Sequence, residues 1–348
     1  MIVKAPAVAK LFGEHAVVYG RLSVAAALDV FANAEITDSE GNALEIELSQ
    51  MGIRESFSKE QLKELFYSYA FRSDIKEFCS SHNGISEHIL PYCTIAGRLM
   101  FGYGINVLGK RVVISSEIPM KKGFASSAAC STAFTVALLK HEGVSLPEGE
   151  IIEIARDGDR ILHRSEGAGR IDVSTSFYGG YVSYSSRKGV RREPINSSIS
   201  IVFIDTGPKK STAETVGHVA ELYNNSKEYV EGIFNMIEEC STKGLEALQK
   251  GDIAVAGSLM FKNHELLDKL GVSSKGLNEA VEHARKHGAY GAKLSGGGGG
   301  GMAIAIHSKP NELLSAFAST GFQTSIHNVA MNGARSSIDG LLNSTYSR

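Results

Sequence analysis

Six consecutive glycines, Gly296 to Gly301, stand in the segment "KLSGGGGGGMAIAI" and lead directly into an apolar stretch. Ordering so many glycines costs much backbone entropy, so the folded loop needs a compensating interaction. A bound anion supplies one, because successive amides without Cβ atoms can turn toward phosphate oxygens. A flexible linker is the alternative. Since the run lies between "YGAKLS" and a hydrophobic strand, we favour a loop that contacts a ligand.

A second segment of similar character is "EIPMKKGFASSAACSTAF", which begins at Glu117. Turn residues at 121–123 precede a helical stretch over 126–139, and Ser126 or a neighbour is expected to cap this helix. A helix N-terminus attracts phosphate through its free amides and partial positive charge, and the hydroxyls of Ser126 and Ser127 can add contacts to phosphate or Mg²⁺. An ordinary capped core helix is the alternative. Neither loop matches GxxxxGK[ST] or GxGxxG, so the two common nucleotide fingerprints are absent.

Composition narrows the class of protein. The 348 residues suffice for one large or two medium domains. A net charge of -2 without any Lys/Arg tract argues against nucleic acid as a partner. The chain opens without the apolar core of a signal peptide and has no uncharged apolar run of about 18 residues, so we expect no membrane span. The four cysteines show no CxxC and no histidines at metal spacing, which favours reduced thiols and a cytoplasmic location.

The order of strand-like and helix-like segments changes along the chain. Strands are predicted at 3–8 and 24–36 and in "KRVVISSEI", "GGYVSYS", "SISIVFIDTG" and "GMAIAIHS", with a basic turn at 187–192. Helices are predicted over 59–69, 89–101, 126–139, 150–162, 211–225, 228–248, 253–270, 275–287 and 311–319. Mixed strands and helices come first and a helix-rich part follows. This order predicts an α+β protein of two lobes, 1–195 and 196–348, with a boundary near 195–205.

Three motifs, taken together, resemble those of the GHMP kinases. "PAVAKLFGEHAVVYG", Pro6 to Gly20, is similar to the first family motif and is nearest in form to the mevalonate kinases. "PMKKGFASSAA" is similar to the second motif, and "KLSGGGGGGMAIAI" to the third. A weaker likeness to archaeal-type mevalonate kinases covers "IVFIDTGPKKSTAETV" and "GDIAVAGSLMFKNHELLDKLGV". The resemblance implies an N-terminal lobe of ribosomal-protein-S5-like type, a C-terminal lobe with a ferredoxin-like core, and ATP in the cleft between them.

The resemblance also implies roles for individual residues. Lys10 matches the lysine beside the reacting hydroxyl, and Glu14 and His15 match substrate-side positions. "GAGRIDVSTSFYGG" places Asp172 seven residues ahead of a Gly-Gly, as in the family's catalytic aspartate segment. Ser127 matches the serine that ligates Mg²⁺. The residues expected at the ATP phosphates are Lys122, Gly123, Phe124, Ala125, Ser126, Ser127 and Ala128 of the second motif and Gly296, Gly297, Gly298 and Gly299 of the third.

The sequence departs from the family pattern at several points. Ala168–Gly169–Arg170 replaces the Pro-Ser-Gly that precedes the family's aspartate. The glutamate that ligates Mg²⁺ has no clean match, and Asp159 and Glu166 both stay open as the second ligand. The basic residues Arg164, Arg170, Lys121 and Lys122 lie near the expected substrate. A more anionic acceptor would suit them, although lysines that simply reach ATP are the favoured explanation.

These features predict an ATP- and Mg²⁺-dependent kinase that phosphorylates the primary hydroxyl of mevalonate, in isoprenoid synthesis. Phosphoryl transfer needs an aligned nucleophile, an acceptor for its proton and neutralised phosphate charge. An aspartate beside a lysine serves the first two needs. The alternatives are a kinase for mevalonate 3-phosphate or 5-phosphate, a decarboxylase-like relative, and a non-catalytic ligand-binding protein of the same fold. The expected partner is a small-molecule substrate, and a homodimer is left open.

Overall fold

The computed structural model describes residues 1–119, 122–209 and 212–337. The first lobe is built on a sheet with the strand order β4-β3-β5-β2-β6-β7, and β1 pairs antiparallel with β2 beside this path. The strands are β1 (Ile2–Phe12), β2 (Ser23–Asp38), β3 (Leu44–Leu48), β4 (Ile53–Phe57), β5 (Lys110–Ser116), β6 (Tyr181–Ser185) and β7 (Gly189–Glu193). β1 and β2 are rich in alanine and valine and are buried along most of their length, so helices can approach the sheet closely.

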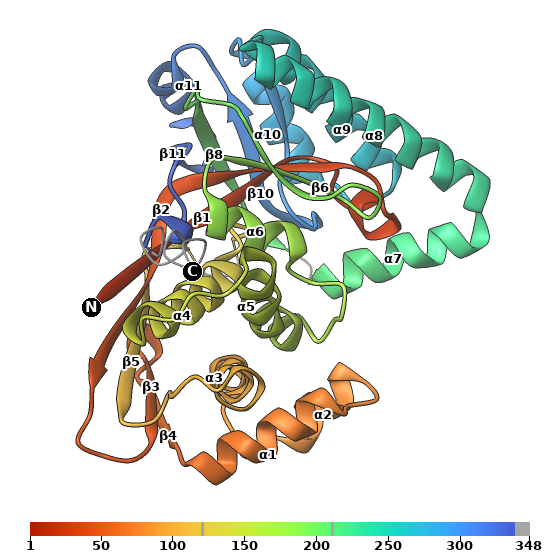
Figure 1. Ribbon diagram of the computed structural model, residues 1–348. Coiled ribbons are helices and arrows are strands. Elements are labelled where there is room, and N and C mark those ends of the chain that lie inside the picture. The colour runs from red at the N-terminus through yellow and green to blue at the C-terminus, as the bar shows by residue number, and fades with distance from the viewer. Residues whose placement is uncertain (120–121, 210–211, 338–348) are drawn as a thin grey trace.

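Helices cover one face of this sheet in successive layers (Figure 1). α4 packs directly on β1 and β2, α5 packs on α4, α3 on α5, and α1 on α3. The helices of this lobe are α1 (Lys59–Ala70), α2 (Ile75–Ser81), α3 (Leu90–Tyr103), α4 (Ser126–His141), α5 (Glu148–His163) and α6 (Arg170–Tyr178). α4 is buried almost all round because it lies between the sheet and α5. At its N-terminus only the first two residues, Ser126 and Ser127, are partly exposed.

The second lobe is built on an antiparallel sheet with the order β11-β8-β10-β9. Its strands are β8 (Ser200–Lys209), β9 (Gly291–Leu294), β10 (Gly300–Ile306) and β11 (Gln323–Asn328), and its helices are α7 (Thr212–Asn225), α8 (Lys227–Lys250), α9 (Ile253–Lys269), α10 (Lys275–Lys286) and α11 (Pro310–Phe317). α9, α10 and α11 pack against the sheet, and α8 packs on α9 (Figure 1). The six-glycine run enters β10, which is buried throughout.

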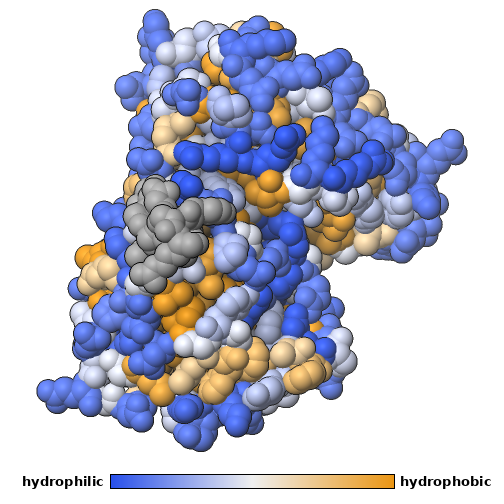
Figure 2. Space-filling model, in the orientation of Figure 1, coloured by the Kyte–Doolittle hydropathy of each residue, from blue (hydrophilic) through white to orange (hydrophobic). Residues whose placement is uncertain are grey.

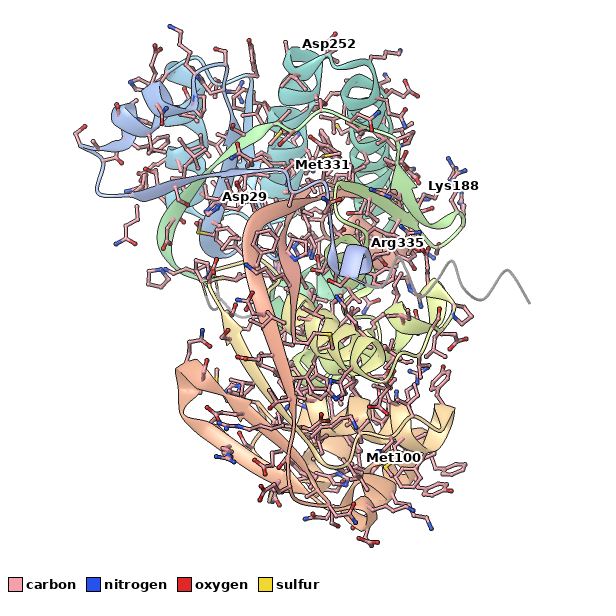
Figure 3. The ribbon with its side chains drawn as sticks, turned by 60° about the vertical axis from the view of Figure 1, so that its left-hand side comes forward. Asp29, Met100, Lys188, Asp252, Met331 and Arg335 are labelled. Atoms are coloured by element: carbon pink, nitrogen blue, oxygen red, sulfur yellow. The ribbon has the colours of Figure 1, made fainter. Side chains whose placement is uncertain are left out.

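The last described residues return to the first lobe. A β-bridge joins Leu28 to Val329, and the short 3₁₀ helix η3 (Ala334–Ser337) packs on α4, α6 and β1. Figure 3 shows Met331 and Arg335 on this returning segment, next to the first-lobe sheet. The two sheets divide between Glu193 and Ser200, but the chain crosses back later. The lobe limits 1–195 and 196–348 therefore stay a prediction.

The predicted α+β class is confirmed, and every predicted helix overlaps one of α1, α3, α4, α5 and α7–α11, although position 211 lies outside the described residues. The basic turn predicted at 187–192 is wrong in part, because β7 occupies most of it as an edge strand. Exposed charged side chains are typical of such edges. β3, β4, α2, α6, β9 and β11 were not predicted. None of the helices in the described ranges has the length and apolar character that a membrane crossing requires.

Candidate active site

The candidate active site contains an ion pair between β1 and α6. Lys10 lies near the end of β1, Asp172 lies in the first turn of α6, and 2.9 Å separates Nζ from Oδ2. Both side chains are partly open, at 26% and 14% exposure. Burial, the largest single cause, would lower the pKa of Lys10, but the carboxylates of Asp172, Glu14 and Asp159 together raise it above its usual value. The other carboxylate oxygen, Oδ1, has no hydrogen-bond partner among the described residues.

The serine loop reaches this pair from the N-terminus of α4. Ala125 is the N-cap residue, in a left-handed conformation with φ 54°, and no side chain caps the helix. The prediction that Ser126 or a neighbouring side chain caps α4 is therefore wrong, because Ser126 is already the first helical residue and its hydroxyl approaches Ser116. The first amides of α4 are left without an intrahelical or side-chain partner, which makes them donors for an anion.

The residues that precede α4 are anchored to both lobes. The Phe124 carbonyl accepts from the Val8 amide of β1 at 3.0 Å, and the Phe124 ring stacks on Phe203 of β8 with centroids 4.3 Å apart. Lys122 pairs with Asp205, also on β8. Gly123 has φ 89°, a conformation that favours glycine. The loop thus has a fixed path between the sheets of the two lobes.

Ser127 lies beside Asp159 of α5. The Ser127 hydroxyl donates to Asp159 Oδ1 at 2.5 Å, and His163 Nε2 lies 3.5 Å from the same oxygen. Burial would raise the pKa of Asp159, but His163 and Ser127 together lower it. Asp159 in turn raises the pKa of His163 and contributes to the raised pKa of Lys10. Ser127, Asp159 and the Lys10–Asp172 pair therefore form one electrostatically coupled group.

The two candidates for the second metal ligand lie apart. Glu166 is half exposed and forms a two-point ion pair with Arg72, whereas Asp159 is buried and contacts Ser127. Two oxygen ligands fit Mg²⁺, which usually keeps several waters and binds phosphate oxygens besides one or two carboxylates. No cluster of three or more His, Cys, Asp or Glu side chains suited to a metal occurs within the described residues. The geometry favours Asp159 over Glu166.

The glycine run forms a tight loop between β9 and β10. Gly296, Gly298, Gly299, Gly300 and Gly301 all have positive φ. A Cβ on Gly298 would lie 2.0 Å from the Val272 carbonyl oxygen, and the Gly299 amide donates to that same oxygen at 2.8 Å. Glycine is therefore required here by close approach and by backbone conformation.

The glycine loop contacts both other motifs. A Cβ on Gly123 would lie 3.5 Å from the Ser295 carbonyl, so the serine and glycine loops adjoin. His15 Nε2 lies 3.0 Å from the Gly297 carbonyl oxygen. Burial, the largest cause, lowers the pKa of His15 to about 4, and it is neutral at pH 7. The structure thus brings the three sequence motifs together.

The Glu14 side chain is sealed from solvent, unlike the partly exposed Lys10–Asp172 pair. Its carboxylate is buried and pairs with Lys293 of β9, whose side chain is fully buried. Sequence reasoning missed both Lys293 and His163. For His163, the spacing of four residues from Asp159 on one helix was an available signal. For Lys293, only its place in the third motif could have drawn attention.

The basic residues near the site mostly have carboxylate partners. Arg164 lies 3.6 Å from Glu87, and Arg170 lies 3.0 Å from Glu153. Lys122 is paired with Asp205, as described above. Lys121 lies outside the described residues. In Figure 2 hydrophilic side chains gather where the outline of the molecule narrows between the two lobes. The positive charges of Arg164, Arg170 and Lys122 are therefore already paired with carboxylates of the protein.

Two family models match the chain: the GHMP kinases N terminal domain at residues 91–180 and GHMP kinases C terminal at 245–322. A mevalonate kinase from Thermococcus sibiricus is 32% identical over 346 residues, covering 96% of this chain and 98% of that protein. One from Thermococcus gammatolerans is 33% identical over 347 residues, with coverages of 96% and 98%. The crystal structure of the Methanococcus jannaschii mevalonate kinase aligns with a TM-score of 0.76 at 26% identity, covering 95% of this chain and 98% of that one. The chain therefore belongs to the GHMP kinase family and groups within it with archaeal mevalonate kinases.

Proposed function

We propose that this kinase transfers the terminal phosphoryl group of ATP to the primary hydroxyl of mevalonate. The observation that carries the proposal is the partly open Lys10–Asp172 pair, coupled to Ser127 and Asp159. The similarity over nearly the whole chain to enzymes named mevalonate kinase supports the choice of acceptor.

The proposed reaction uses these residues in defined roles. The Asp172 carboxylate accepts the hydroxyl proton as the alcohol oxygen bonds to the γ-phosphorus. The bond from that phosphorus to the bridging oxygen of ADP breaks, and ADP carries the electron pair away. The Lys10 ammonium, 2.9 Å from Asp172, stabilises the developing alkoxide. The uncapped amides of α4 and the glycine loop hold the phosphates.

Magnesium belongs to the same proposal. Ser127 and Asp159 supply two adjacent oxygens on one side of the serine loop, and they would hold the ion. At that position the ion would supply positive charge against the phosphate oxygens. His15 lies on the first-motif side, where the family resemblance predicts the acceptor, whereas the Glu14 carboxylate is sealed against Lys293. Because Arg164, Arg170 and Lys122 already have carboxylate partners, mevalonate is favoured over a phosphorylated acceptor.

An acceptor panel tests the proposal. Mg-ATP is supplied with mevalonate, mevalonate 3-phosphate, mevalonate 5-phosphate, galactose or homoserine, and ADP and CO₂ release are followed. We expect ADP only with mevalonate and no CO₂. Preferred turnover of a phosphorylated mevalonate would overturn the acceptor assignment, and CO₂ release would indicate a decarboxylase. ATP binding without ADP from any acceptor would support a non-catalytic ligand-binding protein.

A further inference from the structure

Lys293, a buried lysine of the second lobe, contacts two residues of the first motif, Glu14 and Lys10. Lys293 is fully buried, and its Nζ pairs with Glu14 and donates to the Leu294 carbonyl at 2.6 Å. The same nitrogen lies 3.5 Å from the backbone carbonyl of Lys10. Burying an ammonium is costly unless it is paired and hydrogen-bonded, and an apolar pair of similar volume is often as stable. Stability alone therefore does not explain a lysine at this position.

The neighbours of Glu14 are also held by the second lobe. The Gly13 amide donates to Asn263 Oδ1 of α9 at 3.3 Å, and His15 contacts the Gly297 carbonyl. Gly13 has φ 91°, and a Cβ there would lie 2.4 Å from the Leu22 carbonyl oxygen. Three consecutive residues that follow β1 thus each contact a different second-lobe residue. This leaves the end of β1, and with it Lys10, little freedom.

We propose that Lys293 is a positioning residue for the phosphoryl transfer. Through Glu14 and the Lys10 carbonyl, it fixes the end of β1 against the glycine loop, so that the Lys10 ammonium meets Asp172 and the reacting hydroxyl. Because the Lys293 side chain is sealed from solvent, it acts through these protein contacts and not directly on the substrate. The kinetic part of this inference rests on the proposed function.

A double variant separates positioning from stability. Lys293→Met and Glu14→Leu each leave one buried charge unpaired, and both single variants should melt at clearly lower temperature than the wild type. Lys293→Met/Glu14→Leu leaves no unpaired charge and should recover most of the melting temperature. We expect its kcat to stay at least about tenfold below the wild type with little change in the KM for ATP, because the contacts to the end of β1 are still missing.

Lys110→Met is the matched control. Lys110 is also a buried lysine with one carboxylate partner, Glu142, at 2.9 Å, but it lies near the far end of α4. Lys110→Met should lower the melting temperature with kcat within about twofold of the wild type. Recovery of wild-type kcat in the double variant would overturn the inference. So would a loss of kcat in Lys110→Met as large as in the double variant.

Hydrogen exchange gives a readout that needs no acceptor. The amides of residues 10–15 should exchange faster in the double variant than in the wild type and at the wild-type rate in Lys110→Met. Wild-type exchange in the double variant would contradict the inference even if mevalonate is not the substrate. Failure on the acceptor panel alone would overturn only the proposed function. Should the double variant not fold, Glu14→Gln replaces it: this variant keeps the shape but turns the ion pair with Lys293 into a weaker neutral contact, and residues 10–15 should still exchange faster than in the wild type.

Discussion

Two lysine–carboxylate pairs lie close together in this molecule and differ in one respect. Lys10 and Asp172 are 26% and 14% exposed, whereas Lys293 and Glu14 are 0% and 1% exposed. Each carboxylate leaves one oxygen without a hydrogen-bond partner among the described residues. The pairs therefore share their chemistry and differ in access. Only the open pair can meet a substrate, and only the sealed pair can act entirely through the backbone around it.

The histidines near the two pairs show the same difference. Burial lowers the pKa of both His15 and His264 to about 4; Lys293 adds to the effect at both, and Lys10 adds to it at His15. His163 lies beside Asp159 on the open side, and that carboxylate raises its pKa. The surroundings of the sealed Lys293–Glu14 pair thus disfavour an additional positive charge, whereas the carboxylates around His163 favour one. The carboxylates around His163 therefore create a negative potential, which suits a bound cation such as Mg²⁺.

The largest expected effect concerns the open pair itself. Lys10→Met should lower kcat by about 100-fold or more, equivalent to about 2.7 kcal/mol, because the ammonium no longer stabilises the developing charge. The free energy of unfolding should change by less than about 1 kcal/mol, since a partly exposed pair contributes little to stability. Steady-state kinetics and urea unfolding check both values.

Lys4→Met is the control for that experiment. Lys4 lies on the same strand, where it contacts the Phe31 ring instead of a carboxylate of the site. Its kcat should stay within about twofold of the wild type. A Lys10→Met enzyme with nearly normal kcat and markedly lower stability would reverse the comparison, because the open pair would then be the structural one.

A smaller effect tests whether Asp159 or Glu166 is the second Mg²⁺ ligand. Asp159→Asn should raise the Mg²⁺ concentration for half-maximal activity about tenfold or more, equivalent to about 1.4 kcal/mol, because a ligand oxygen beside Ser127 loses its charge. Glu166→Gln is the matched control, since Glu166 is paired with Arg72 and should leave the Mg²⁺ requirement unchanged. If Glu166→Gln raised this Mg²⁺ concentration and Asp159→Asn did not, Glu166 would be the metal ligand.

The last prediction concerns the buried histidine His264 and is measured through the pH dependence of stability. The folded protein keeps His264 neutral down to about pH 4, whereas the unfolded chain binds a proton near pH 6.5. The unfolded state therefore binds more protons between these values, and stability falls as pH falls. Each such histidine contributes a slope of up to about 1.4 kcal/mol per pH unit.

Urea unfolding between pH 6.5 and 4.5 measures this slope. His264→Gln should remove one histidine's share of the slope and leave the shares of His15 and His327, whose pKa values burial also lowers. His163 does not obscure the result, because its pKa is raised and its favourable contribution is complete below pH 6.5. If the free energy of unfolding of the wild type did not change over this pH range, His264 and its surroundings would be accessible to water.

The sequence predicted the open pair better than the sealed one. Lys10, Asp172 and Ser127 stand in motifs whose spacing identifies a family, and the structure places them in one coupled group. Lys293 was missed because a lysine beside a strand is usually a solvated charge, and only packing from both lobes buries it. The choice between Asp159 and Glu166 likewise depends on tertiary contacts, since Arg72 comes from a distant helix–helix connection.

The elements predicted best are those in which the hydrophobic pattern extends over many residues. The amphipathic helices of the second lobe were found from their pattern, whereas the short α6, with its polar and β-branched residues, was not. The capping of α4 was predicted incorrectly for a related reason. Serines at a helix start normally suggest a cap, but here Ala125 takes a left-handed conformation and leaves the amides free. That exception coincides with the proposed phosphate site.

The most direct test of the account is the turnover of mevalonate by Asp172→Asn. The substitution keeps the shape of the side chain and removes its capacity to accept a proton. With ATP binding measured separately, the account predicts a kcat at least about 1,000-fold below that of the wild type and an unchanged affinity for ATP. A kcat within about tenfold of the wild type would contradict it, because Asp172 would then not be the group that receives the hydroxyl proton.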